Sequence, residues 1–220
     1  MSKIITSKPF LLIFYGYPGS GRTYFARQFS EEFQVANLQS DRIRSELFEK
    51  PRYDSQENSI TRQLMDYMCE EFLAAGLSVI YDADILKNGQ RAFLRTMANK
   101  YKAEFVICCL QVDEETSFAR NIRRDKRKID DKYSPKWDRT TFDKIIKQMQ
   151  NPITNTEVVV ISGKHLYQTQ RNAVVAHFKR RAILNTNEMK NEIAKPGMVN
   201  LVPSVNAGRV NMSRRNIFIR

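Results

Sequence analysis

The stretch Phe10-Leu11-Leu12-Ile13-Phe14-Tyr15-Gly16-Tyr17-Pro18-Gly19-Ser20-Gly21-Arg22-Thr23 decides the fold. Its first six residues form an apolar run that predicts a buried strand. The following pattern, G-x-x-x-x-G-[basic]-T, leads into Tyr24, Phe25, Phe29 and Phe33, which share one face of an expected helix. A strand, a glycine loop and a helix in this order are typical of a phosphate-binding loop.

The loop has the chemistry that phosphate groups require. Its glycines allow successive backbone N–H groups to turn inward, and the positive end of the following helix adds to the attraction. Arg22 stands where the usual pattern has lysine, and Thr23 offers a hydroxyl to Mg²⁺. A glycine-rich turn without a ligand is the alternative. The predicted nucleotide-binding residues of this segment are Gly16, Tyr17, Pro18, Gly19, Ser20, Gly21, Arg22, Thr23 and Tyr24.

Strands and helices alternate along the chain as far as residue 184. Further strands are predicted over 35–40, 77–81, 105–112 and 157–161. The run over 105–112 is continuously apolar, which is typical of a parallel strand covered on both faces. We therefore expect an α/β P-loop NTPase/kinase fold: a parallel five-stranded sheet flanked by helices, with a basic helical lid. Ligands of such sheets bind at the carboxyl ends of the strands.

Helical periodicity and capping residues place the helices. Residues 51–59 are expected to form a loop, after which apolar residues recur at helical spacing from Ile60 to Phe72. Phe93 is expected to face inward from the helix that follows an Asn-Gly break. Asp113 is predicted to cap the next helix, because a carboxylate there accepts from free backbone N–H groups. A last helix is predicted over 167–184.

Length and composition limit the class of protein. The 220 residues predict one domain over 1–185, with a lid at about 120–137, and a basic, flexible tail over 186–220. No apolar run is long enough to span a membrane, and the start of the chain does not have the form of a signal peptide. The three cysteines show no C-x-x-C spacing, which favours buried thiols in a reducing cytoplasm.

The net charge of +12 is unevenly distributed. Residues 120–150 contain 11 basic and 5 acidic side chains, a balance of +6. Residues 180–220 contain 8 basic and 2 acidic side chains, again +6. Such patches attract polyanions, including nucleic acid. A solvated helix face in a protein of basic composition explains the charge equally well, and an inert tail is as compatible with the sequence as a binding arm.

Two carboxylates are expected beside the loop. Asp82 ends a buried strand, where it can accept from a Mg²⁺-bound water or simply cap the next turn. Asp41 follows another strand, and Arg44 lies three residues on, so the two share one face of a helix start. Asp41 is predicted to take the proton of an attacking hydroxyl, and Arg44 to hold an anionic substrate. A helix N-cap with a surface ion pair is the alternative.

A group of arginines follows the fourth strand. Arg120, Arg123, Arg124 and Arg127 have the spacing i, i+3, i+4 and i+7, which predicts one stripe along a helix. A solvent-facing stripe of this kind is common. If the stripe faces a triphosphate, it stabilises the charge that develops on the transferred phosphoryl group. The two histidines, His165 and His177, have no companions at metal-ligand spacing and are interpreted as structural or surface residues.

Taken together, these motifs resemble the kinase domain of polynucleotide 5′-hydroxyl kinases and the wider group of small P-loop kinases. The loop is similar to G-x-P-G-S-G-K-S/T, and Asp41-Arg42-Ile43-Arg44 is similar to the D-x-x-R element. Asp82-Ala83-Asp84 stands in place of D-[TN]-[NT], and Arg120-Asn121-Ile122-Arg123-Arg124 is similar to the R-N-x-x-R lid. The resemblance covers roughly residues 10–152.

The resemblance implies roles for individual residues. Asp41 would be the general base and Arg44 the contact to the substrate phosphate. Arg120 and Arg124 would hold the donor phosphates of ATP, while Thr23 and Asp82 would organise Mg²⁺. The implied activity is ATP-dependent transfer of a γ-phosphoryl group to a hydroxyl acceptor, such as the 5′-hydroxyl of a nucleic acid.

The chain departs from the family pattern at two positions. Arg22 replaces the lysine that reaches the β- and γ-phosphates, and Asp84 replaces a neutral residue near the metal. These departures keep open a second interpretation, a catalytically weakened nucleotide-binding or ATPase module with a regulatory role. A plain NTPase that uses water as acceptor is a third. The acceptor, the nucleotide preference and the oligomeric state do not follow from the sequence.

Overall fold

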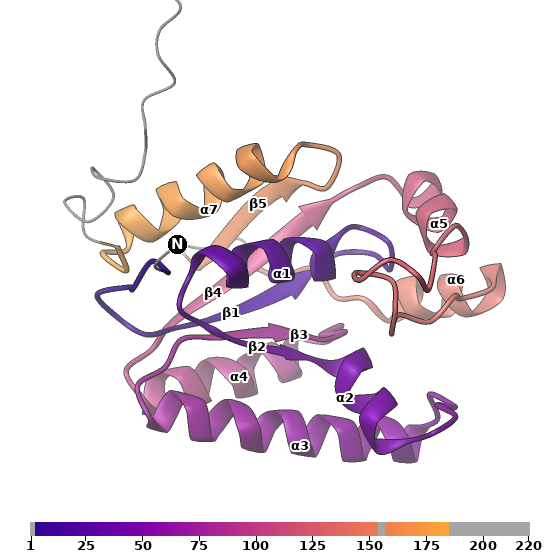
Figure 1. The fold of residues 1–220 in the computed structure, drawn as a ribbon, viewed down its shortest axis with the longest axis horizontal. Coiled ribbons are helices and arrows are strands. Elements are labelled where there is room, and N and C mark those ends of the chain that lie inside the picture. Colours follow the sequence, from indigo (N-terminus) through magenta and orange to yellow (C-terminus); the bar gives the residue numbers. More distant parts are fainter. Residues whose placement is uncertain (1–2, 154–156, 185–220) are drawn as a thin grey trace, which may run out of the picture. The chain divides into compact units, whose positions relative to one another are not determined.

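A computed structural model describes residues 3–153 and 157–184 of the 220-residue chain (Figure 1). The strands are β1 (Phe10–Tyr15), β2 (Ala36–Gln39), β3 (Val79–Asp82), β4 (Glu104–Gln111) and β5 (Val158–Ser162). The helices are α1 (Arg22–Glu32), α2 (Ser40–Leu47), α3 (Ser55–Ala74), α4 (Asn88–Lys100), α5 (Glu114–Ile122), α6 (Arg139–Gln148) and α7 (Tyr167–Arg180). The elements alternate as the sequence predicts.

The five strands form one parallel sheet in the order β2-β3-β1-β4-β5. Leu11 of the central strand β1 pairs with Val79 of β3 on one side and with Phe105 of β4 on the other. All pairings between these strands are parallel, because every connection between neighbouring strands crosses over through at least one helix. The predicted α/β fold with a five-stranded parallel sheet is confirmed.

Helices cover both faces of the sheet. Helices α1 and α7 lie on one face, and α3 and α4 lie on the other (Figure 1). Three helices begin at an aspartate whose carboxylate accepts a backbone N–H from the first turn: Asp54 for α3, Asp113 for α5 and Asp138 for α6. Such caps satisfy donors that a helix start leaves free. The predicted cap at Asp113 is therefore confirmed.

Side chains of β1 alternate between the two faces of the sheet. Phe10 and Phe14 point to the α1 side, where the Phe10 ring lies 6.5 Å from the Phe29 ring and the Phe14 ring 6.0 Å from the Phe25 ring. Leu11, by contrast, belongs to the core on the α3 and α4 side. All of these side chains are fully buried. The apolar run of β1 is thus buried from both directions.

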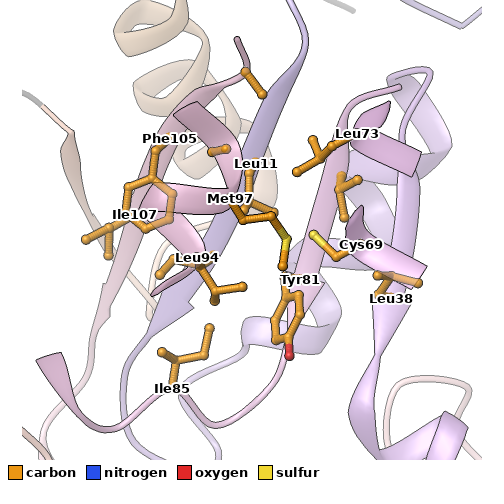
Figure 2. Packing of buried hydrophobic residues seen from close by; sticks show 14 of the residues in the cluster. Leu11, Leu38, Cys69, Leu73, Tyr81, Ile85, Leu94, Met97, Phe105 and Ile107 are labelled. Carbon is orange, nitrogen blue, oxygen red and sulfur yellow. The ribbon is translucent and has the colours of Figure 1, made fainter. Parts of the chain in front are cut away.

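The second core lies between the sheet and helices α3 and α4. Figure 2 shows how Leu73 and Cys69 of α3 and Leu94 and Met97 of α4 surround the Tyr81 side chain of β3. Each buried aliphatic side chain of this size contributes about 2–5 kcal/mol when compared with alanine. This core fixes the end of β3, and therefore the carboxylates that follow it.

Four local expectations were wrong. Residues 55–59 belong to helix α3, because Asp54 supplies an N-cap before the apolar periodicity starts. Phe93 is 53% exposed, since it lies on the outer face of α4, and Tyr24 is 41% exposed although its neighbour Phe25 is buried. Helix α5 ends at Ile122, so residues 123–138 form turns and extended segments and the lid is not helical there.

The remaining expectations concern the last helix, the tail, the cysteines and membrane-spanning segments. The last helix ends at Arg180, four residues before the predicted end. The predicted tail over 186–220 lies outside the described residues. Cys69, Cys108 and Cys109 are buried and free, as expected of structural thiols. Among the described residues, no helix is both long and apolar enough to cross a membrane.

Candidate functional site

The glycine loop connects the end of β1 to the start of α1. Gly19 has a φ of 89°, and a Cβ atom built on it would lie 2.3 Å from the backbone oxygen of Ser117. Gly21 has a φ of 102° and occupies the N-cap position of α1. L-amino acids with side chains rarely adopt such φ values, and at Gly19 there is no room for a side chain. The glycine spacing is therefore required by the backbone path.

The loop has the features of an anion site. The first turn of α1 contains no acidic residue, so the positive end of the helix is not neutralised there. Ser20 is fully buried, and its Oγ atom has no hydrogen-bond partner within the described part of the chain. Ser20 lines none of the three cavities at this edge of the sheet, so the anion site rests on the free helix end and the loop backbone instead of on this hydroxyl. The loop thus fits the phosphate groups that the sequence predicts.

Thr23 and Asp82 meet beside the loop. The Thr23 hydroxyl donates a hydrogen bond of 2.7 Å to the carboxylate of Asp82, which is 4% exposed. Burial raises the pKa of Asp82, while the Arg22 guanidinium and the Thr23 hydroxyl oppose this shift. One hydroxyl and one carboxylate suit Mg²⁺, which keeps several waters and binds mainly through substrate phosphates.

Thr23 and Asp82 are the candidate metal ligands beside the loop. Within residues 3–153 and 157–184, no cluster of three or more His, Cys, Asp or Glu side chains is arranged to hold a metal ion. A dedicated protein cage for a metal is therefore not part of the site. The donor set of Thr23 and Asp82 still fits a magnesium ion that arrives with a nucleotide.

Arg22, the first residue of α1, lines the loop cavity and contacts the residues that follow β3. Its Nη2 atom donates to Asp84 Oδ1 at 2.5 Å, and its Nη1 atom donates to the Ala83 carbonyl oxygen at 3.4 Å. Only 13% of the Arg22 side chain is exposed, against 44% of the Asp84 side chain. Burial disfavours the charge on Asp84, but the Arg22 guanidinium outweighs it and lowers the pKa of Asp84.

Asp41 lies in the first turn of α2, directly after β2. Burial raises the pKa of its carboxyl to about 7, and the neighbouring carboxylates of Asp84 and Asp82 add to this effect. The guanidinium groups of Arg124 and Arg22 act in the opposite direction. A carboxylate with a pKa near neutrality is suited to accept a proton from a hydroxyl.

Arg44 lies one turn further along α2 in a different environment. It is 6% exposed and donates to the Asn58 side chain at 2.7 Å, while Glu57 lies 3.5 Å away. Its guanidinium also lies 4.5 Å from the ring centre of Tyr53. The Nε atom of Arg44 is buried and has no partner among the described residues. Part of its donor capacity therefore remains available.

The two predicted lid arginines contact backbone carbonyl groups. Arg120, near the end of α5, donates to the Gly163 oxygen at 2.9 Å, and Arg124 donates to the Pro135 oxygen. Burial lowers the pKa of Arg124, whereas the Asp41 carboxylate favours its charged form. Arg124 lies in the turn segment after α5, so it is not on one helical stripe with Arg120.

Two cavities open at the carboxyl edge of the sheet. We call the first the loop cavity: it measures about 440 Å³, and its lining includes Gly19, Thr23, Asp82, Arg120, Arg124 and His165. We call the second the α3 cavity: it measures about 620 Å³, and its lining includes Tyr53, Thr61, Arg62, Met65, Phe93 and Trp137. Four residues line both cavities: Ser40, Asp41, Ala83 and Asp84. The cavities therefore meet at Asp41 and Asp84.

Most of the predicted site residues come together. The loop cavity is lined by Gly19, Gly21, Arg22, Thr23, Tyr24, Asp41, Asp82, Arg120 and Arg124. Arg44 lines only the α3 cavity, and Gly16 and Tyr17 line a third cavity beside β4 and β5. Pro18 and Ser20 do not line any of these three cavities. The structure thus separates Arg44 from the phosphate loop and keeps it near Asp41.

Sequence reasoning missed residues after the last strand. Gly163 and His165 line the loop cavity, and so does Gln170 of α7. A Cβ atom at Gly163 would lie 2.3 Å from the Ser20 backbone oxygen, so this glycine allows the last strand to approach the loop. A signal was present, because Gly163 lies two residues after the predicted strand 157–161, whose carboxyl end lies at the site edge. His165, interpreted as a structural or surface residue, is exposed in this cavity.

The fold and this site define the class of protein. A glycine loop between β1 and α1, with a hydroxyl and a strand-end carboxylate beside it, on a parallel sheet of this order is the P-loop NTPase/kinase fold. Residues 11–152 match the AAA_33 family, which is described as an AAA domain, and the chain belongs to this family. No curated protein sequence matches the chain.

Solved structures of several kinases and related proteins share the fold. Chaetomium thermophilum Kti12 in complex with ADP-AlF3 is 17% identical, with a TM-score of 0.61, over 80% of this chain and 100% of that chain. A gluconokinase from Sinorhizobium meliloti is 14% identical, with a TM-score of 0.57, over 79% and 94% of the chains. The Mycobacterium tuberculosis APS kinase in complex with AMPPNP and APS is 17% identical, with a TM-score of 0.52, over 78% and 98%.

Proposed function

We propose that this protein transfers the γ-phosphoryl group of ATP to a hydroxyl acceptor. The observation that carries this proposal is the meeting of two cavities at Asp41 and Asp84. The loop cavity has phosphate-binding chemistry, and the α3 cavity offers a separate space for a second substrate. A protein that only hydrolyses nucleotides has no need of that second space. Solved structures of the same fold include kinases, which supports the same reaction class.

Asp41 is the proposed general base. It accepts the proton of the acceptor hydroxyl as that oxygen bonds to the γ-phosphorus. The bond between the γ-phosphorus and the bridging oxygen breaks at the same time, and its electron pair stays with ADP. Burial and neighbouring carboxylates bring the pKa of Asp41 to about 7, so its basic form is well populated near neutral pH.

The remaining site residues position the phosphates. The glycine loop and the N-terminus of α1 donate backbone N–H groups, and Arg120 and Arg124 add positive charge to the lining of the same loop cavity. Thr23 and Asp82 are the residues that would hold Mg²⁺. When bound, Mg²⁺ neutralises charge on the phosphate oxygens. Three buried free thiols are compatible with a reducing compartment such as the cytoplasm.

The chemistry of the α3 cavity favours a nucleic-acid 5′-hydroxyl as acceptor. Tyr53 and Trp137 lie edge to face with their ring centres 5.0 Å apart, and both line the cavity together with Phe93. Aromatic rings of this kind stack on nucleobases. Arg62 and Lys87 add positive charge to the same lining. The same lining also carries hydrogen-bonding side chains, among them Asn58, Thr61 and Gln90, so a sugar is the competing acceptor in the test.

A second candidate function is a nucleotide-binding module with weak or no turnover. It is favoured by one observation, the pairing of Arg22 with Asp84, because a carboxylate then neutralises the guanidinium charge at the loop. A site that lacks the usual loop cation would bind nucleotide and transfer its phosphate slowly. Such a module would signal its nucleotide state to a partner.

The test uses ATP labelled on the γ-phosphate, with Mg²⁺ and a panel of acceptors. The panel contains 5′-hydroxyl DNA and RNA oligonucleotides, nucleosides, sugars and water alone. We expect label on the 5′-hydroxyl ends, and loss of that label in Asp41→Ala. Label on a small molecule would retain the kinase and reject the nucleic acid. Bound ATP without any transfer would support the nucleotide-binding module.

Glu46→Gln is the matched control for the Asp41 variant. Glu46 lies on the same helix α2 and is exposed, and it lines neither the loop cavity nor the α3 cavity. Its substitution removes one carboxylate from α2 without touching the site. Transfer by Glu46→Gln should equal that of the wild type. A loss as large as that of Asp41→Ala would assign the effect to helix charge instead of to proton transfer.

A further inference from the structure

The two departures of this chain from the family pattern contact each other. Arg22, in place of the loop lysine, donates to Asp84, which replaces a neutral residue after β3. The two residues are 62 positions apart in sequence. Each change alone would disturb the site, because a lone arginine crowds the loop and a lone carboxylate adds repulsion. Together they neutralise each other.

The contact lies where the two cavities meet. Asp84 and Ala83 line both cavities, and they are the two residues that receive the Arg22 guanidinium. Arginine can hold two acceptors at once because its nitrogens form a rigid fork, whereas a lysine ammonium is a single point charge. The guanidinium is therefore fixed at the junction of the two cavities, next to Asp84.

Stability alone does not account for this pair. The Asp84 side chain is 44% exposed, and ion pairs with a solvated partner add little stability. The position also carries a cost, since Asp41, Asp82 and Asp84 place three carboxylates close to a site for anionic phosphates. The pairing with Arg22 offsets the Asp84 charge, so we expect the pair, and not Asp84 alone, to have a role in the reaction.

Building on the proposed function, we propose that Asp84 is a positioning residue for Arg22. It holds the guanidinium at the junction of the two cavities, where Arg22 meets the phosphoryl group as that group moves toward the acceptor. In this arrangement Arg22 contributes little to binding of the resting nucleotide and more to the transfer step. Interactions that form only in the transition state raise kcat without tightening substrate binding.

The test is a double-mutant cycle of Arg22→Lys, Asp84→Asn and the variant with both changes. Four quantities are measured: the affinity for ATP without acceptor, kcat for transfer, KM for transfer, and the melting temperature. Asp84→Asn releases Arg22 and removes one negative charge, so we expect ATP to bind about tenfold more tightly while kcat falls about tenfold. Arg22→Lys leaves Asp84 without its fork-shaped partner and should lower both the affinity for ATP and kcat.

The variant with both changes should recover most of the lost kcat, because it has a lysine in the loop at position 22 and an uncharged asparagine at position 84. Non-additive effects of about tenfold or more in ATP affinity or kcat are the expected result. If the two single changes simply add in both quantities, the positioning role is overturned. If only the melting temperature shows coupling, the pair is structural and the proposal is rejected.

Asp130→Asn provides the matched control. Asp130 also lines the loop cavity and pairs with an arginine of α1, Arg27, at 2.6 Å. Its substitution removes the same charge from the same cavity but leaves Arg22 in place. A similar gain in ATP affinity in this control would show that charge alone explains Asp84→Asn. The affinity arm needs no acceptor, so the pair can be judged even if the proposed kinase activity fails.

Discussion

The loop cavity and the α3 cavity share Asp41 and Asp84 but differ in their chemistry. The loop cavity is formed by backbone turns, a helix N-terminus and charged side chains, including Arg120 and Arg124. The α3 cavity combines aromatic and aliphatic side chains with polar ones, and Trp137 and Tyr53 lie edge to face in it. One suits a triphosphate and the other suits a flat organic group.

This difference suggests that, in the proposed reaction, one cavity binds the phosphate groups of the donor and the other binds the acceptor. Phosphate groups are alike in all nucleotides, so a backbone loop with fixed geometry can hold them. Acceptors vary, so their cavity is built from side chains that can change without disturbing the loop. The division predicts that changes in one cavity affect one substrate, while changes at the junction affect transfer itself.

The largest separation should come from Gly19→Ala. A Cβ at this position would lie 2.3 Å from the Ser117 oxygen, and the φ of 89° is unfavourable for alanine. We expect ATP affinity to fall about 100-fold, with a loss of about 1–3 kcal/mol in the free energy of unfolding. Fluorescent nucleotide titration and urea unfolding measure the two effects.

Gly89→Ala is the control for this substitution. Nothing lies within 4 Å of a Cβ atom at Gly89, which is in the first turn of α4. This change should leave ATP affinity unaltered and keep or slightly raise stability. Equal losses of affinity in the two variants would contradict the account of the loop cavity.

A smaller effect is expected in the α3 cavity from Trp137→Ala. Loss of one stacking surface costs about 1–3 kcal/mol per base, so KM for a 5′-hydroxyl oligonucleotide should rise about 30-fold. The affinity for ATP should change less than twofold. Steady-state kinetics with each substrate varied in turn measures both. Tyr67→Ala, which removes an aromatic side chain that is 61% exposed on α3 and lines neither cavity, should change neither value.

At the junction, activity should follow the titration of Asp41. Its basic form is the active one, and its pKa is about 7. The value of kcat/KM should therefore rise with pH and level off above 7, with about a tenfold loss at pH 6. A pH profile of phosphoryl transfer measured at low substrate concentration checks this. A flat profile from pH 5.5 to 8 would exclude Asp41 as the base.

The smallest effect concerns stability. The pKa of Asp41 in the folded protein is about 7, above its ordinary value of 3.8, so the folded state binds this proton more tightly. Its contribution to stability is therefore present below pH 4 and is lost as pH rises from about 4 to 7. Asp41→Asn should stabilise the protein at pH 8 by about 1–2 kcal/mol, a value reduced by water in the cavities. Urea unfolding at pH 4 and 8 should show this gain only at pH 8.

The two cavities also differ in how far the sequence predicts them. Thr23 and Asp82 lie in or beside local motifs, because the glycine loop and a buried strand with a terminal aspartate can be recognised in short windows. The residues of the α3 cavity come from separate elements, including Tyr53 before α3, Phe93 of α4 and Trp137 before α6. Their meeting depends on tertiary packing, which no local pattern records.

Two local predictions, the start of α3 and the arginine stripe, were wrong for similar reasons. The start of α3 was missed because Asp54 caps it six residues before the apolar periodicity becomes visible at Ile60. The arginine stripe was wrong because helix α5 ends at Ile122, where the chain turns toward Trp137. The contact between Arg22 and Asp84 joins two departures from the family pattern, and only the fold brings them together.

The most direct test of the central claim compares Asp41→Asn with Glu46→Gln in a single turnover. Each protein is saturated with γ-labelled ATP and mixed with a 5′-hydroxyl oligonucleotide, and ATP affinity is measured on the same samples. We predict that Asp41→Asn binds ATP at least as well as the wild type and transfers label about 10²- to 10⁴-fold more slowly. Glu46→Gln should equal the wild type in both ATP affinity and transfer rate. Equal transfer by Asp41→Asn and the wild type would contradict the claim that phosphoryl transfer takes place at the junction of the two cavities.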